Sequence, residues 1–153
     1  AKRYDIKGRA YIGTPLKYYF SDVGLRNARL NFRQQEETHI IENILYNELS
    51  SRGFSVDVGV VEYNWKDDAE RSRRSQLEVD FVLNKADKRY YIQSALTVAT
   101  QEKKDQELNS LLRIDDSFQK LVVVKDDILP WTDEHGISYI NVQDFLLDAI
   151  DRL

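Results

Sequence analysis

The sequence contains no cysteine and no methionine, and only two prolines and six glycines among its 153 residues. The absence of cysteine excludes disulfide frameworks, thiolate zinc sites and cysteine nucleophiles. No apolar run approaches the roughly 18 residues that cross a membrane, and no signal-peptide core opens the chain, so we expect a cytoplasmic location and no membrane partner. Because the chain begins at Ala1 and lacks methionine, we interpret it as a piece excised from a longer protein.

A large excess of charge of one sign is also lacking. Charged residues make up 31% of the chain, but the net charge is only −4. This balance argues against a general nucleic-acid coat protein. Hydrophobic residues, at 42%, supply enough apolar surface for one sizeable core, and the length suits a single domain.

Hydrophobic periodicity predicts the order of helices and strands. Apolar residues at spacings of three and four predict a helix over residues 36–51, which Gly53 ends. The period then changes to two, which indicates strands, and two later segments again have an amphipathic helical pattern. The predicted strands are 54–63, 77–83, 89–98, 120–125 and 137–142, the later helices are 102–113 and 143–153, and 64–76 is a polar loop. The order α-β-β-β-α-β-β-α predicts an α/β fold with a mixed central sheet flanked by helices.

The residues before the first long helix have weaker signals. Residues 4–20 resemble two short extended runs broken at Gly13-Thr14-Pro15, and Ser21-Asp22 offers an N-cap for a short helical turn. The glycine spacing from Gly8 to Gly13 is that of a phosphate-binding loop. However, the Lys-Ser/Thr pair that should follow is absent, so we predict no ATP site within this chain.

Two further groups of residues have ordinary explanations. His39 and His135 lie far apart in the sequence, and neither has a second ligand at metal-site spacing, so we predict that both are surface residues. Arg71, Arg73 and Arg74 lie in the polar loop and could contact a nucleic-acid backbone. The alternative, which we favour, is a solvated loop whose charges are offset by its own acids.

The carboxylates carry the sharpest chemical signal. Glu42 lies at the edge of the apolar stripe of the first long helix, and Glu78 and Asp80 share one face of a strand. On the next strand, Gln93 and Ala95 share a face. Acids on a helix and on two paired strands, with a lysine two residues after the last acid, would bind Mg²⁺ against a scissile phosphate. Here the last acid is replaced by neutral Gln93, and the lysine by Ala95.

These residues and the order of elements resemble the PD-(D/E)XK restriction-endonuclease-like fold, which has an αβββαβ core. The resemblance assigns Asp80 to the motif aspartate, Gln93 to the (D/E) position and Ala95 to the lysine position. It implies a degenerate catalytic site of Glu42, Asp80 and Gln93. Strand alternation and the position of Glu42 on the rim of its helix stripe predict that these three residues face one shallow cleft, with Glu78 at its edge. The resemblance also implies that Asp80, Glu42 and Glu78 bind a divalent metal such as Mg²⁺ weakly at most.

A second resemblance covers nearly the whole chain and rests on five segments in order, namely Lys17–Arg26, Glu42–Leu49, Arg52–Phe54, Glu78–Phe81 and Tyr91–Gln93. Together they are similar to the uncharacterised C-terminal domain of a large prokaryotic family of AAA-type P-loop ATPases. In that family an ATPase domain comes first and a winged-helix-like segment follows it. The resemblance implies that residues 1–20 are the tail of that segment and that 21–153 form the nuclease-like domain. ATP would bind only in the absent N-terminal domain, which would be a partner of this one.

Three functions follow as hypotheses. We favour a nuclease-fold domain that no longer cleaves and that serves the ATPase in binding or assembly. One alternative is a Mg²⁺-dependent DNA nuclease with a rearranged site, in which Lys103 or Lys104 supplies the missing lysine. The other is a pure protein-interaction domain with an unknown partner. On the first hypothesis, the double change Gln93→Glu and Ala95→Lys should restore metal affinity.

Overall fold

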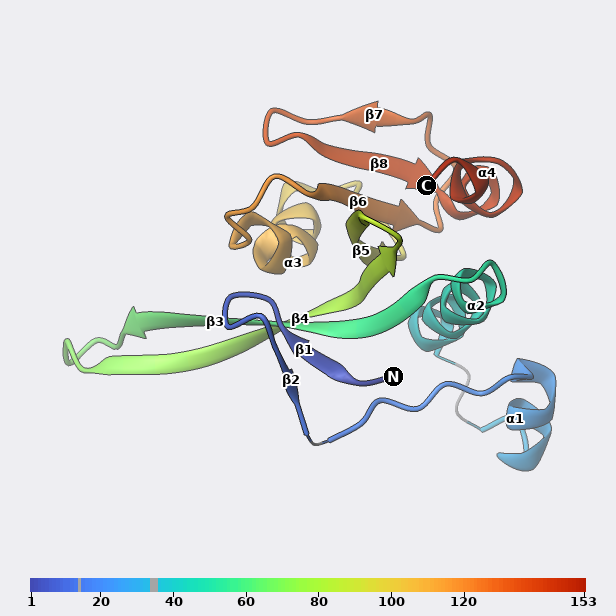
Figure 1. Ribbon diagram of the computed structural model, residues 1–153, viewed down its shortest axis with the longest axis horizontal. Helices are drawn as coiled ribbons and strands as arrows, with labels where there is room; N and C mark the ends of the chain where they lie inside the picture. The colour runs from blue at the N-terminus through green and yellow to red at the C-terminus, as the bar shows by residue number, and fades with distance from the viewer. Residues whose placement is uncertain (14, 34–35) are drawn as a thin grey trace.

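The computed structural model describes residues 1–13, 15–33 and 36–153, and within them one eight-stranded sheet carries helices on both faces (Figure 1). The strands are β1 (Arg3–Asp5), β2 (Ala10–Ile12), β3 (Ser55–Lys66), β4 (Ser72–Lys85), β5 (Lys88–Ala95), β6 (Gln119–Val124), β7 (Trp131–Thr132) and β8 (Ile137–Asn141). The helices are α1 (Val23–Arg29), α2 (Glu37–Ser51), α3 (Gln101–Leu112), α4 (Val142–Leu147) and the 3₁₀ helix η1 (Ala149–Arg152). None of these helices is long and apolar enough to cross a membrane.

The sheet is mixed, in the order β2-β1-β3-β4-β5-β6-β8-β7. Strands β3, β4 and β5 form an antiparallel meander. After α3 the chain returns as β6, parallel to β5, and β8 then pairs parallel to β6. Strand β1 pairs parallel to β3, and the short strands β2 and β7 form the antiparallel edges. The predicted α/β fold with a mixed sheet flanked by helices is therefore confirmed.

Each face of the sheet has its own hydrophobic core. On one face, Leu108 and Leu111 of α3 pack against residues such as Val82 of β4. On the other, Leu45 of α2 and Phe145 of α4 pack against the central strands. Because both faces are covered, the central strands are apolar at nearly every position, which is why β6 has a continuous apolar run.

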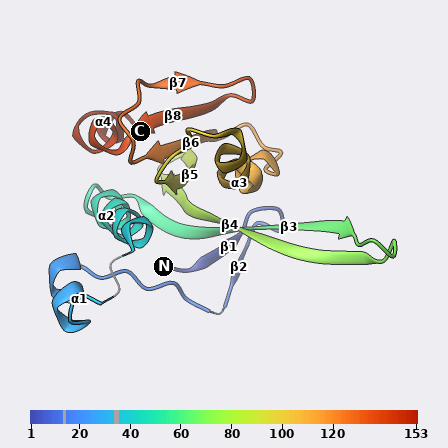
Figure 2. The same ribbon diagram turned by 180° about the vertical axis from the view of Figure 1, so that it is seen from behind.

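A long ribbon of β3 and β4 projects from the body, as Figures 1 and 2 show. The predicted loop at 64–76 is wrong over most of its length, because β3 continues to Lys66 and β4 begins at Ser72. The backbone ladder holds this part together, and Trp65 Nε1 donates to Ser75 Oγ at 2.8 Å. Since the ribbon packs on no core, its residues lack the apolar alternation that reveals a strand in a sequence.

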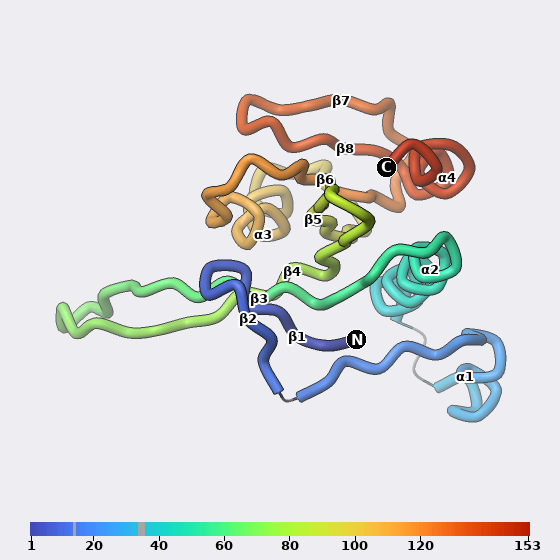
Figure 3. Tube along the Cα trace, in the orientation of Figure 1, coloured from blue at the N-terminus to red at the C-terminus, as the bar shows by residue number. Residues whose placement is uncertain are grey.

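Residues 15–33 run along the outside of the molecule (Figure 3). Residues 16–20, which we call the strap, are extended but belong to no strand. The strap leads into α1, where Asp22 Oδ1 accepts the N–H of Leu25 at 2.9 Å, which confirms the predicted N-cap. The predicted break at residues 13–15 includes Thr14, which lies outside the described residues.

Candidate functional site

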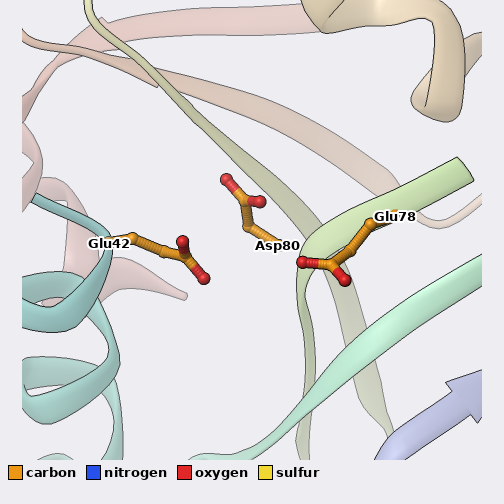
Figure 4. Close-up of side chains that lie close together, drawn as sticks. All are labelled: Glu42, Glu78 and Asp80. Atoms are coloured by element: carbon orange, nitrogen blue, oxygen red, sulfur yellow. The ribbon is translucent and has the colours of Figure 1, made fainter. Parts of the chain in front are cut away.

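Three carboxylates converge between α2 and β4. Glu42 extends from α2, and Glu78 and Asp80 extend from β4, and each offers an oxygen that lies within 4.8 Å of the others. Figure 4 shows the three side chains directed into one space. The structure thus brings these three residues together, as the sequence predicted; we call them the acidic cluster.

The strap places a cation inside the acidic cluster. Lys17 Nζ lies 2.5 Å from Glu42 Oε1 and 2.6 Å from Glu78 Oε1, so it bridges the two carboxylates. The Tyr19 hydroxyl donates to Glu42 Oε1 at 2.6 Å, and Arg3 pairs with Glu78 at 2.7 Å. Lys17 and Tyr19 were not predicted from the sequence as site residues. The available signal was the extended segment around them, in which alternate residues face one side.

Side chains of α2 fix the strap in this position. The Phe20 backbone N–H donates to Asn43 Oδ1 at 2.8 Å, and Asn43 Nδ2 donates back to the Phe20 carbonyl at 2.7 Å. Asn47 Nδ2 also donates to that carbonyl, at 2.8 Å. At the other end, the Lys17 N–H donates to the Ala1 carbonyl at 3.1 Å. The ammonium group of Lys17 is therefore held in the cluster by contacts on both sides of it.

Asp80 is the most deeply buried ionisable residue of β4. Its Oδ2 accepts the backbone N–H of Ser94 at 2.8 Å and the Ser94 hydroxyl at 2.6 Å. Burial and the negative charge of Glu42 raise the pKa of Asp80 to about 7, although the Ser94 hydrogen bonds act in the opposite direction. Near neutral pH, Asp80 is therefore divided between its protonated and ionised forms.

The remaining charges of the cluster are paired. Burial lowers the pKa of Lys17, but its bonds to Glu42 and Glu78 outweigh burial and leave that pKa above its usual value. Burial raises the pKa of Glu78, but Lys17 and Arg3 outweigh it and hold that pKa below the usual value. Three carboxylates beside two cations leave one negative charge, which a proton on Asp80 cancels.

Gln93 does not belong to the cluster, so the predicted cleft of Glu42, Asp80 and Gln93 is wrong in that respect. Gln93 lies on the opposite face of the sheet, beside Glu107 of α3, where burial raises the pKa of that carboxyl and Gln93 acts to lower it. Its Oε1 reaches only the backbone N–H of Asp80, at 3.3 Å. Ala95 points to the same α3 face, where it is 1% exposed within the core. On β5 it is Ser94, between these two residues, that faces the cluster.

A β-bulge explains this difference. The register of β3 and β4 shifts by one residue between Asp57 and Gly59, so Val58 lies opposite two residues of β4, Asp80 and Phe81. The extra residue turns Asp80 onto the α2 face, where Phe81 also packs. Without the bulge, Asp80 would share a face with its cross-strand neighbour on β5, as the sequence analysis assumed. Bulges redirect single side chains in this way, often beside functional sites.

The lysines proposed as replacements lie elsewhere. Lys104 Nζ is placed over the ring of Trp131, 4.8 Å from its centroid. Lys103 interacts with Glu107, on the α3 side of the sheet. The cations that pair with the acidic cluster are Lys17 and Arg3, which both precede the cluster's first acid in the chain.

The arginines of the ribbon form ion pairs within it. Arg71 and Arg73 both pair with Asp67 at 3.1 Å, and Arg74 pairs with Glu62. This pattern matches the favoured interpretation of a charge-balanced solvated segment. The two histidines are exposed, as predicted.

A divalent metal does not fit the cluster as it stands. Mg²⁺ prefers carboxylate oxygens at 2.0–2.1 Å, which places opposite ligands about 4.2 Å apart, and the cluster's donors and spacing are close to this. However, the Oε1 atoms of Glu42 and Glu78 that face inward both contact Lys17 Nζ. An ion would have to displace this ammonium group.

Comparison with known proteins gives one informative relative. An uncharacterized protein of Haemophilus influenzae is 33% identical to this chain over 147 residues, which are 96% of this chain and 32% of that protein. The chain therefore spans about a third of the length of the curated relative it matches. No family model and no solved structure matches the chain.

Proposed function

We propose that this chain is a nuclease-fold domain that no longer cleaves and that serves a larger AAA-type ATPase in binding or assembly. The observation that carries the proposal is Lys17, whose ammonium group lies between the carboxylates that would otherwise hold a metal. The position that the resemblance assigns to the lysine is occupied by Ala95, which is buried on the other face. An ion-pair network thus takes the place of the metal, and alanine takes the place of the catalytic lysine.

The fold supports descent from a nuclease. The order α2-β3-β4-β5-α3-β6 is the αβββαβ order of the restriction-endonuclease-like core, with an antiparallel meander followed by a parallel strand. An acid on α2 and an acid in the middle of β4 converge, as that resemblance implies. The length of the relative supports a multidomain protein, because two thirds of that protein lie outside the match.

The proposal is tested by incubating the chain with duplex, junction and single-stranded DNA in Mg²⁺ or Mn²⁺. We expect no cleavage, because in the described part of the chain Lys17 is paired with Glu42 and Glu78 where a metal would bind, and Ala95 stands at the position of the catalytic lysine. Cleavage that is lost in Asp80→Ala would contradict the proposal. Cleavage that survives this change would indicate a contaminating nuclease, and a repurified sample decides between the two.

One observation favours the alternative of an active nuclease. Lys17 is an ammonium group within 2.6 Å of two cluster carboxylates, so it could act as a lysine that has moved to another segment. The two functions predict opposite effects of Lys17→Met. A nuclease loses its cleavage activity, whereas the structural network loses stability and the vacated carboxylates gain affinity for a divalent metal.

A further inference from the structure

Large apolar side chains are exposed along the strap, α1 and the residues that follow α1. Six large apolar side chains within 17 residues are exposed, and α1 has no buried residue. Tyr18 is 79% exposed and Leu25 is 71% exposed. The six residues, which we call the apolar face, are Leu16, Tyr18, Phe20, Leu25, Leu30 and Phe32. Groups of exposed apolar side chains often mark interaction sites, whereas single exposed apolar residues need no explanation.

Successive residues of the strap face opposite sides. Its odd-numbered residues, Lys17 and Tyr19, point into the acidic cluster. Its even-numbered residues point away from the cluster and form the first half of the apolar face. A hollow of about 220 Å³ lies between the strap and α2, where Tyr18 and His39 are among its lining residues. A partner that covers the apolar face would therefore also hold Lys17 in the cluster.

The charge around the apolar face indicates the chemistry of its partner. Residues 16–33 contain four basic residues and one acidic residue, in a chain whose net charge is −4. Lys17 is paired within the cluster, so the other charged residues of this segment are three arginines and one aspartate. An apolar surface rimmed by carboxylates complements this arrangement.

The position of the N-terminus indicates where the partner comes from. The Ala1 amino group donates to the Lys17 carbonyl at 2.5 Å, and the Lys17 N–H donates to the Ala1 carbonyl at 3.1 Å. Any polypeptide joined to Ala1 therefore leaves the domain beside the strap (Figure 3). In the Haemophilus influenzae relative, two thirds of the chain lie outside the matched region. A tethered partner has a high effective concentration, so even a modest interface stays occupied.

We propose that the apolar face is the docking surface for the polypeptide that precedes Ala1 in the complete protein. This inference rests on the proposed function, in which the domain is one part of a larger ATPase. The docked segment presents apolar side chains to Tyr18, Leu25 and Phe32 and carboxylates to the arginines around them. Docking thereby fixes the strap and stabilises the ion-pair network of Lys17.

Hydrogen–deuterium exchange tests the inference by comparing the complete protein with the 153-residue chain. We expect the amides of the strap and α1 to exchange at least about tenfold more slowly in the complete protein. Leu25→Glu, and independently Tyr18→Ser, should restore the faster exchange there. The matched controls are Leu129→Glu and Leu147→Glu, which alter equally exposed leucines outside the apolar face and should leave the protection unchanged.

Three outcomes would overturn the inference. These are equal exchange rates in the two proteins, protection that disappears on dilution and so indicates a second copy, and protection that requires a separate protein. An ATP hydrolysis assay on the same complete protein separates this inference from the proposed function. Absent ATP binding and hydrolysis would refute the proposed ATPase, whereas protection of the apolar face would still demonstrate docking. Hydrolysis with an unprotected apolar face would refute only the docking.

Discussion

Replacing Asp80 by asparagine should stabilise the protein, and the gain should grow with pH. The side chain is almost fully buried, and burial together with Glu42 raises its pKa from 3.8 to about 7. Because the folded pKa lies above the unfolded one, the folded state binds more protons between pH 4 and 7. The stability that comes from protonated Asp80 is fully present below pH 4 and is lost as the pH rises through 7. A difference of about three pKa units corresponds to about 4 kcal/mol, an upper bound because structural relaxation reduces it.

An asparagine keeps the hydrogen bonds and removes the charge. Its amide oxygen can accept both the N–H and the hydroxyl of Ser94, which Asp80 accepts now. We therefore expect Asp80→Asn to raise the free energy of unfolding at pH 8.5 by about 2–4 kcal/mol, and by much less at pH 5. Asp127→Asn changes an exposed carboxylate and serves as the control.

Urea denaturation at the two pH values measures this difference. The informative quantity is the change in unfolding free energy between Asp80→Asn and the unmodified protein, compared at pH 5 and pH 8.5. Other groups titrate in both proteins and cancel in this comparison. If Asp80→Asn is destabilising by the same amount at both pH values, the ionised form is not disfavoured in the folded state and the reasoning fails.

Three further changes test other parts of the structure. Lys17→Met should lower the free energy of unfolding at pH 8 by about 1–3 kcal/mol in a urea titration, because it leaves buried Glu42 and half-buried Glu78 without their shared cation. An unchanged midpoint would contradict this. Gly59→Ala should lower the free energy of unfolding by about 1–3 kcal/mol, measured by thermal unfolding, since its Cβ would lie 2.9 Å from atoms of both Val79 and Val82. An unaltered transition would show that the bulge can relax. Ala95→Lys should lower the free energy of unfolding by about 3 kcal/mol or more, measured by guanidinium denaturation, because it places an unpaired ammonium group in the α3 core. Gain of metal binding would instead support the assignment of Ala95 to the lysine position.

The last change also revises an expectation from the sequence. The double change Gln93→Glu and Ala95→Lys was expected to rebuild a metal site on the cluster face. Both side chains lie on the opposite face of β5, so the double change should disrupt the α3 core instead. The β-bulge at Asp80 is the cause, and its signature in a sequence is weak because it alters a register rather than a residue pattern.

Burial decides which parts of the fold could be predicted from the sequence. The helix α2 and the central strands have apolar residues at the period of their element, because each packs against a core. The outer half of the β3–β4 ribbon packs against nothing, and its strands were predicted as a loop. The convergence of Glu42 with Asp80 was predicted from their positions on a helix edge and a strand face. The contact of Lys17 with both Glu42 and Glu78 spans up to 61 residues, and the alternation of the extended segment around Lys17 does not identify these partners.

The most direct test of the non-cleaving function is calorimetric titration of Mn²⁺ into the unmodified protein and into Lys17→Met. We predict no binding in the micromolar range by the unmodified protein, because Lys17 already occupies the cluster. We predict measurable binding by Lys17→Met, because this change leaves the converging carboxylates free to bind the ion. Asp80→Ala added to Lys17→Met should weaken that binding again. Micromolar binding by the unmodified protein that is lost in Asp80→Ala, accompanied by cleavage of DNA, would contradict the account.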